Sequence, residues 1–357
     1  MAWQGVLGHD DVARWFRRAA ARGRLASTFL FVGPAGIGKH TFALRLAQAL
    51  LCQHPRAEES LDPCQECESC RLARAGNHPD LHQVSRPQQK SSIPIELLIG
   101  ERERRMQSGL CHEIALKPYL SDRKVAIIDD ADWLNVEGAN SLLKTLEEPP
   151  PGSVLILISS SAEKQLPTIR SRCQVVRFRP LETAVIAQLL LEREIVCDTS
   201  EAQRLAAYSE GSFERATQLA DAELWDFRQR MLPWLIAPLA KGNELSSAMS
   251  AFLDAAGREA PVRRQRARDV LGLAIDFYRQ LLRRLSGEAP GDENEASRLV
   301  QSAADEGRLD AERAAALLER TLLAVQHVDS NANQPNWLDG WIDDLGQIEA
   351  HGAVSLA

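Results

Sequence analysis

The sequence of 357 residues contains no apolar run near 18 residues, the length that a membrane-spanning helix needs. Its first residues, MAWQGVLGHDD, lack the basic segment and apolar core of a secretion signal. An excess of positive charge is also missing, because the formal net charge is -7. Non-specific DNA binding depends on counterion release by Lys and Arg, so this charge disfavours a protein that coats DNA. We therefore expect a globular cytoplasmic protein with no membrane partner.

Length and hydropathy predict more than one domain. A chain of 357 residues, of which 45% are apolar, is too long for one small core and indicates two or three domains. Strand-like and helix-like runs mix in the first half, and from about residue 223 one helical pattern follows another. We expect an α/β domain, a small helical lid domain and an all-helical domain at residues 1–179, 180–222 and 223–357. Turn signals divide the last domain at residues 241–243, 287–292 and 329–336.

A glycine-rich loop lies between a predicted strand and a predicted helix. Thr28–Val32 is a short apolar run typical of a buried strand, and a helix is predicted from Thr41 to Leu51. Strand, loop and helix in this order are what a phosphate-binding P-loop requires, since the loop's N–H groups cradle phosphates and its lysine reaches the terminal ones. The predicted nucleotide-binding residues of this loop are Gly33, Gly36, Gly38, Lys39, His40 and Thr41.

One position of this loop departs from the motif. The residue after the lysine should be Ser or Thr, whose hydroxyl ligates Mg²⁺, but here it is His40. Mg²⁺ prefers oxygen ligands in octahedral geometry, so an imidazole is a poor replacement. Thr41 comes one residue late, and successive helical residues are rotated by about 100° from each other. ATP and Mg²⁺ are therefore expected to bind weakly or statically, with little or no turnover.

A second strand and its carboxylates complete the predicted nucleotide site. Val125–Ile128 is a continuous apolar run, as expected for a strand buried on both faces of a parallel sheet. Asp129 and Asp130 follow at its carboxyl end, where open α/β sheets bind ligands. Such a Walker B strand is shared by P-loop ATPases in general. Other expected elements are a helix at residues 10–22, a loop-like stretch at 52–85, helical structure over 94–118 and a strand at 154–159.

Four of the seven cysteines cluster in the sequence. Thiolates at this short spacing suit a tetrahedral Zn²⁺ of the structural kind, in a module at about residues 52–70, with the ligands Cys52, Cys64, Cys67 and Cys70. An iron–sulfur cluster and free thiols are the alternatives, although the Cys-Pro that follows in ferredoxins is absent. We expect Cys111 and Cys197 in the core, and His78 and His82 on the surface.

Two further motifs identify a family. The segment Asn140–Pro150, NSLLKTLEEPP, resembles the helix that follows Walker B in bacterial clamp-loader subunits, the AAA+ proteins that open the sliding clamp of the replicative polymerase. Ser171-Arg172-Cys173 is similar to the Ser-Arg-Cys motif that carries the arginine finger in that family. The match covers mainly residues 1–220. It implies an AAA+ fold with a parallel sheet, a zinc module after the P-loop helix, and a helical oligomerisation collar at 223–357.

Departures from the hydrolysing members of this family narrow the resemblance. Those members carry Glu where Asp130 stands, and a sensor 2 arginine in a Gly-Ser-x-Arg pattern. This chain reads Gly211-Ser212-Phe213-Glu214, with Arg215 displaced by one residue, so a sensor 2 role is in doubt. Ser159 and Ser160 stand near the sensor 1 position but equally suit the start of a turn. These departures favour the delta prime branch, whose members largely do not hydrolyse ATP.

The resemblance also implies a mechanism and partners. Arg172 would act in trans on ATP bound by a neighbouring subunit, since an arginine finger stabilises charge on a transferring phosphoryl group. The partners would be gamma/tau and delta subunits in a hetero-oligomeric ring, the sliding clamp, and primed DNA through the assembled complex. A surface arginine paired with a neighbouring carboxylate is the structural alternative for Arg172. For the whole chain, an ATP-hydrolysing motor of the gamma/tau type and, more remotely, a small-molecule phosphotransferase remain as alternatives.

Overall fold

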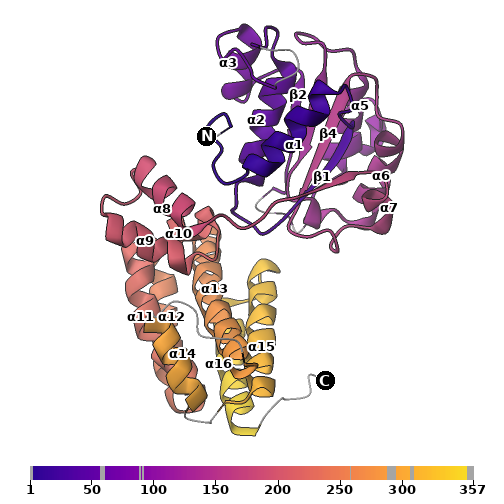
Figure 1. Cartoon of the computed structure of the whole chain (residues 1–357). Coiled ribbons are helices and arrows are strands. Elements are labelled where there is room, and N and C mark those ends of the chain that lie inside the picture. The colour runs from indigo at the N-terminus through magenta and orange to yellow at the C-terminus, as the bar shows by residue number, and fades with distance from the viewer. Residues whose placement is uncertain are drawn as a thin grey trace. The chain divides into compact units, whose positions relative to one another are not determined.

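A computed structural model describes residues 3–56, 61–87, 90, 92–257, 259–287, 295–305 and 309–351 (Figure 1). The chain divides into two compact units, Met1–Thr217 and Gln218–Ala357. The three-domain division expected from the sequence stays a prediction. Within the described residues, no helix is both long and apolar enough to cross a bilayer.

The first unit is built on a five-stranded sheet in which every pair of neighbouring strands is parallel. The strands are β1 Thr28–Val32, β2 Leu81–Val84, β3 Lys124–Ile128, β4 Ser153–Ser159 and β5 Gln174–Arg177, in the spatial order β2-β3-β4-β1-β5. Val32 is paired with Ser159, and Ile128 with Leu157. The carboxyl ends of the three central strands therefore meet at one edge. The predicted α/β fold with a parallel sheet is confirmed.

Helices cover both faces of this sheet. The helices of the first unit, with two 3-10 turns, are α1 Asp10–Ala21, α2 Lys39–Leu51, α3 Glu68–Arg74, α4 Ile95–Ile99, η1 Arg102–Arg104, α5 Leu110–Ala115, η2 Ala131–Trp133, α6 Val136–Glu147, α7 Pro167–Arg170, α8 Thr183–Glu192, α9 Thr199–Tyr208 and α10 Phe213–Leu219. The last of them, α10, crosses the boundary between the two units.

Alternation along β1 explains how the two faces are filled, because successive strand residues point to opposite sides. Phe29 and Phe31 pack with aromatic rings of α1 and α2, with ring centroids 5.0 Å apart for Phe16 and Phe29. Figure 1 shows α1 and α2 together in front of the sheet. Leu30 and Val32 belong instead to the core shared with α4, α5 and α6. β1 is buried along its whole length and carries the P-loop at its carboxyl end.

Two expectations for this unit were wrong. The region 94–118 is not continuously helical: α4 ends at Ile99, before Gly100, and α5 begins after Gly109. Both glycines have φ near +83°. A Cβ on Gly109 would lie 2.5 Å from the amide nitrogen of Gly100, so the chain folds back on itself here. The stretch 52–85 contains strand β2 and helix α3 and is not only loop. Two of the four residues of β2 are polar, half-buried His82 and exposed Gln83, so the strand does not form a continuous apolar run.

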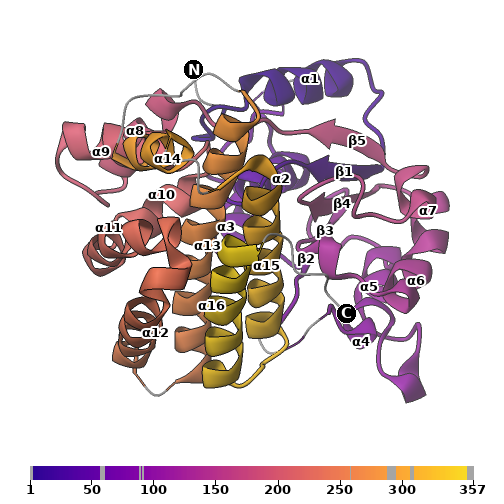
Figure 2. The same cartoon turned by 90° about the horizontal axis from the view of Figure 1, so that it is seen from below.

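The second unit is all-helical, as predicted. Its helices are α11 Ala222–Ile236, α12 Pro238–Ala255, α13 Ala260–Leu285, α14 Glu295–Asp305, α15 Ala311–Asp329 and α16 Gln334–His351. Helix α13 packs against α15, and α16 packs against both α12 and α15. Figure 2 shows α13, α15 and α16 side by side. Trp341 is fully buried in this unit, and its indole nitrogen donates to the hydroxyl of Thr321 at 3.1 Å.

The predicted turns of this unit had different outcomes. The turn at 329–336 is confirmed, because α15 ends at Asp329 and α16 begins at Gln334. The turn at 241–243 was wrong, since α12 runs through it and the Lys241 amide donates to the carbonyl of Ala237. Gly242 allows close packing of α12 against α16, because a Cβ at this position would lie 3.0 Å from a methyl group of Ile342. Of the turn at 287–292, residues 288–292 lie outside the described residues.

Candidate functional site

The P-loop leaves β1 and enters α2, as the sequence predicts. Gly33 has φ +153°, and a Cβ at this position would lie 2.5 Å from the carbonyl oxygen of Phe178. Only glycine fits such close backbone approach. Lys39, the first residue of α2, is buried, and its ammonium donates to the carbonyl oxygens of Gly33, at 2.6 Å, and Pro34. Burial lowers the pKa of Lys39, partly offset by nearby carboxylates. The lysine charge is thus held inside its own loop.

A cavity of 370 Å³ gathers most of the predicted nucleotide-binding residues. Its lining includes all of them except Gly33: Gly36, Gly38, Lys39, His40, Thr41, Asp129 and Asp130. The sequence did not assign a role here to Asp132, Ile158, Arg193 or Phe213, which also line it. Arg215, the displaced sensor 2 candidate, is absent from the lining and lies 3.6 Å from a carboxylate oxygen of Glu210. The cavity is the place where a P-loop protein would hold phosphates.

His40 contacts the carboxylate that would normally serve a metal. Its Nδ1 lies 2.7 Å from Oδ2 of Asp129. Burial alone would raise the pKa of Asp129, but the His40 contact, together with the Lys39 charge, lowers it on balance. Thr41, the next residue along α2, is exposed. Because an imidazole and not a hydroxyl occupies the position beside Asp129, these residues do not fit Mg²⁺ and its octahedral oxygen shell.

Asp130 adopts a left-handed backbone conformation with φ +54°. Its own amide donates to Oδ1 of Asp129 at 2.9 Å, directly after β3. Partial desolvation and the neighbouring charge of Asp129 raise the pKa of Asp130. Its side chain is exposed at the cavity wall. A non-glycine residue in this conformation is uncommon, and such residues cluster at active sites and ligand-binding sites.

A third carboxylate, Asp132, was missed by sequence reasoning. The hydroxyl of Ser159 donates to Oδ1 of Asp132, and the amide of Ser160 donates to Oδ2 at 2.9 Å. Burial opposes ionisation, yet these bonds lower the pKa of Asp132. Ser159 is buried, so its hydroxyl serves this network. The sequence does place a carboxylate shortly after β3 and a serine at the end of β4. Parallel pairing of these two strands brings the two residues together, so a known strand order would have predicted the contact.

Arg172 lies between α7 and β5 and outside the cavity lining. Its Nε and Nη2 each lie 3.3 Å from Oε2 of Glu147, at the end of α6. Its Nη1 donates to the carbonyl of Thr168 at 3.1 Å, and its own carbonyl accepts from the Thr28 hydroxyl at 2.7 Å. The side chain is about one-third exposed. The guanidinium is thus held at the surface by a carboxylate, in the ion pair that the structural alternative describes.

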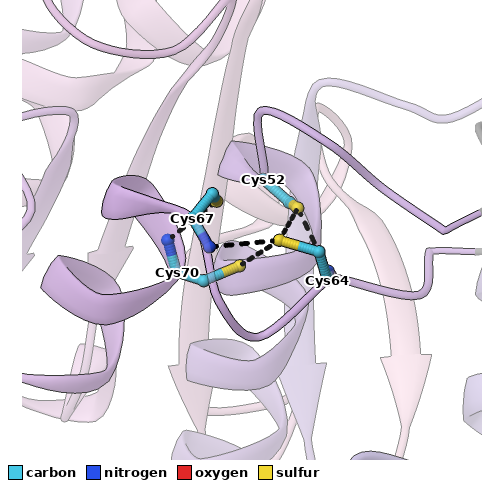
Figure 3. Close-up of side chains that lie close together, drawn as sticks. All are labelled: Cys52, Cys64, Cys67 and Cys70. Atoms are coloured by element: carbon cyan, nitrogen blue, oxygen red, sulfur yellow. Dashed lines mark hydrogen bonds between the residues drawn. The ribbon is translucent and has the colours of Figure 1, made fainter.

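The four clustered cysteines come together around one point (Figure 3). Their sulfur atoms all lie within 4.8 Å of one another, with 3.7 Å between Cys52 and Cys64 and 3.9 Å between Cys64 and Cys70. A tetrahedral Zn²⁺ with Zn–S bonds of about 2.3 Å places its sulfur ligands ~3.8 Å apart. Bonds from the amides of Cys67 and Glu66 lower the pKa of Cys64 to about 6. The geometry therefore fits a structural zinc ion.

The histidine expected on the surface beside this cluster is buried. His78 is 3% exposed, and its Nε2 lies 2.8 Å from the hydroxyl of Ser69, which donates to the carbonyl of Leu51. The Asp80 amide donates to Nδ1 of His78, so this nitrogen is the acceptor and Nε2 carries the proton. His78 joins the cysteine segment to the end of α2 and is not a fifth ligand. The expected surface position was wrong, and His82 is half-buried.

The remaining cysteines divide by burial. Cys111 is buried in the core between the sheet and α4–α6, as expected, and Cys173 is buried in the same core. Burial raises the pKa of Cys173 to about 12, which is inconsistent with a reactive thiolate. Cys197 is exposed, so its expected place in the core was wrong.

Comparison with known proteins agrees with the motifs. The family model described as DNA polymerase III, delta subunit, matches residues 8–182. The chain is similar to DNA polymerase III subunit delta' of Pseudomonas aeruginosa, with 35% identity over 207 residues that cover 57% of this chain and 59% of that protein. It is also similar to subunit tau of Bacillus subtilis, with 28% identity over 224 residues, which cover 63% of this chain and 36% of that protein.

A solved structure matches over a longer range at lower similarity. The crystal structure of a DNA polymerase III gamma subunit-related protein from Thermotoga maritima has 16% sequence identity and a TM-score of 0.41. The match covers 96% of this chain and 99% of that one. In the sequence comparisons, the chain spans about three-fifths of the length of the Pseudomonas relative, at 59%.

Proposed function

We propose that the chain is a clamp-loader subunit of DNA polymerase III, a delta prime-type scaffold that presents Arg172 to a neighbouring ATPase subunit. Its partners would be gamma/tau and delta subunits in a hetero-oligomeric ring. The assembled ring would load the sliding clamp onto primed DNA in the cytoplasm. In this proposal the AAA+ domain, the lid and the collar would occupy residues 1–179, 180–222 and 223–357.

The observation that carries the proposal is the separation of Arg172 from the chain's own cavity. Arg172 does not line that cavity, so it does not act on a phosphate held there and is available to a phosphate outside the cavity. Its pair with Glu147 is solvent-exposed, and exposed pairs contribute only about 0.2–1 kcal/mol. Such a pair orders the guanidinium but is weak enough for a phosphate to displace the carboxylate. A planar guanidinium binds phosphate oxygens with two parallel hydrogen bonds.

The chain's own site supports a scaffold more than a motor. His40 stands where a Mg²⁺-ligating hydroxyl belongs, and it contacts Asp129. Asp130 is shorter by a methylene than the Glu of hydrolysing relatives, and its backbone has a left-handed conformation. The four-cysteine cluster would hold a structural Zn²⁺, which supplies a rigid module and takes no part in turnover.

The test is the ATPase rate of a loader reconstituted with Arg172→Ala in this subunit. We expect the variant to fold and assemble, while the clamp- and DNA-dependent rate falls by about 10³-fold or more, the scale of an arginine finger. Arg172→Lys should rescue poorly because an ammonium lacks the planar fork. Arg170→Ala, an exposed arginine two positions earlier, is the matched control and should keep the normal rate. Normal rates for Arg172→Ala would refute the role in trans.

A second candidate is a nucleotide-hydrolysing motor of the tau type. The similarity to the Bacillus subtilis tau subunit and the intact Gly33, Gly36, Gly38 and Lys39 favour it. The isolated chain separates the two candidates. A scaffold should show only background ATPase activity with clamp and primed DNA, whereas a motor should show stimulated turnover that Lys39→Ala abolishes.

A further inference from the structure

We propose that Glu214 bars nucleotide phosphates from the chain's own P-loop, so that the cavity serves as the docking site of α10 and not as a nucleotide site. The inference deepens the proposed scaffold function and rests on it, because a scaffold needs no nucleotide of its own. In this site a nearly complete glycine loop is combined with residues that do not fit a magnesium nucleotide.

Direct hydrogen bonds tie α10 to the P-loop. The amides of Phe213 and Glu214 donate to the carbonyl oxygen of Gly36 at 2.9 and 3.3 Å. A helix leaves its first amides without intrahelical acceptors, and here a P-loop carbonyl satisfies two of them. In a nucleotide-binding P-loop the lid and the loop would both contact the nucleotide. Here protein atoms make the connection between them.

The contact between α10 and the loop is tight. Gly36 has φ +70°, and a Cβ there would lie 2.3 Å from Oγ of Ser212 and 2.5 Å from Cβ of Glu214. The same position is 3.0 Å from Oε2 of Glu214. The carboxylate therefore lies against the loop that would cradle phosphates, and it lines the cavity with Lys39.

The charges around the cavity oppose an anionic ligand. The cationic side chains that line it are Lys39 and Arg193, and the carboxylates are Asp129, Asp130, Asp132 and Glu214. Arg193 already stacks on the ring of Phe213, 5.4 Å from its centroid. Nucleotide phosphates are themselves negative, and a bound Mg²⁺ normally offsets part of that charge. Here an imidazole, that of His40, lies against Asp129 in place of the hydroxyl that would ligate such a metal. Glu214 adds repulsion at the point where the loop's amides would attract phosphate.

The experiment measures ATP and ADP binding by the isolated full-length chain, with and without Mg²⁺, by calorimetry. The wild-type chain should show no saturable binding at millimolar nucleotide. In a His40→Ser background, which restores a hydroxyl beside Asp129, Glu214→Gln and Glu214→Arg should each bind magnesium nucleotide at least about tenfold more tightly than His40→Ser alone, since removing a nearby like charge favours an anion. Glu182→Gln removes an exposed lid carboxylate outside the cavity lining and should give no gain.

Several outcomes would overturn the inference. Tight nucleotide binding by the wild-type chain would show that the cavity admits nucleotide. If His40→Ser alone bound nucleotide as tightly as the double variants, His40 and not Glu214 would be what excludes it. If the folded Glu214 variants bound magnesium nucleotide no more tightly than the His40→Ser parent, Glu214 would not be the residue that excludes it. Gln and Arg are used together, so that a folding defect of one leaves the other decisive. The Arg172 test uses the ATPase rate of the complex, so either result can fail without the other.

Discussion

Zinc removal is the perturbation whose consequences the structure defines most closely. Cys67 is the N-cap residue of α3, where its sulfur accepts from the amide of Cys70. In Cys67→Ser, the serine oxygen can keep this cap, because serine is a preferred N-cap residue. The substitution therefore removes one metal ligand while it preserves the local helix start. We expect wild-type protein to contain one zinc per chain and the variant to lose most of it.

The size of the effect follows from the segment that the metal closes. Cross-linking a loop of about 15 residues raises the free energy of unfolding of a protein by roughly 3 kcal/mol. The segment from Cys52 to Cys70 has a similar length. Of the four cysteines, none belongs to the core between the sheet and α4–α6. We therefore expect faster amide exchange over α3, with little change in β3 and β4, and a fall in the free energy of unfolding of at most about 3 kcal/mol.

Elemental analysis and hydrogen exchange with and without a chelator are the assays. Cys197→Ser is the matched control, because Cys197 is exposed and lies outside the cluster. It should leave zinc content and exchange unchanged. Iron with visible absorbance, a wild-type chain without metal, or full zinc occupancy in Cys67→Ser would each refute the reasoning.

Two more predictions concern the P-loop and a buried carboxylate. Lys39→Ala should change the ATPase rate of the reconstituted loader by less than about twofold, because the site does not turn over; a large loss would favour the motor function. Asp80→Asn should lower the free energy of unfolding by about 2–4 kcal/mol near pH 7, since the carboxylate accepts from three backbone amides, at residues 119–121. These bonds and His78 outweigh burial and lower the pKa of Asp80, so its stabilisation is present above pH ~4 and is lost as pH falls. Urea unfolding of the wild-type protein and Asp80→Asn should therefore give free energies of unfolding whose difference shrinks from about pH 7 to about pH 3. A difference that stays constant with pH would contradict an ionised Asp80 carboxylate.

The sequence predicted the centre of the first unit well because local and global signals agree there. Thr28–Val32 and the run 125–128 are apolar on both faces, as strands of a covered parallel sheet must be, and both were predicted within one residue. The edge strands gave weaker signals. β2 and β5 expose part of their length, so neither forms a continuous apolar run. Edge strands of this kind read as loop in a single sequence.

The site was predictable where one motif supplies all the residues, and not where distant segments meet. Gly36 to Thr41 were identified from their spacing, and the structure places them around one cavity. The Asp132 network requires knowledge that β3 and β4 are neighbours. The contact of Glu214 with Gly36 joins residues far apart in sequence, through a backbone carbonyl that no side-chain pattern records. Burial of His78 was unpredictable for the same reason, because its partners come from three segments.

One strand links the two halves of the proposed function. β1 begins at Thr28, whose hydroxyl donates to the carbonyl of Arg172, and it ends at Val32, directly before the P-loop. β1 is a buried, paired strand, so a change in the P-loop that moved it would also move Arg172. If α10 and Glu214 hold the P-loop in one state, the position of Arg172 does not depend on a nucleotide cycle in this chain. A neighbouring subunit that opens and closes with its own ATP would then meet an arginine in a fixed place. On this reasoning, Glu214→Arg with His40→Ser should make the loader's rate sensitive to Lys39→Ala, whereas the wild-type loader is not.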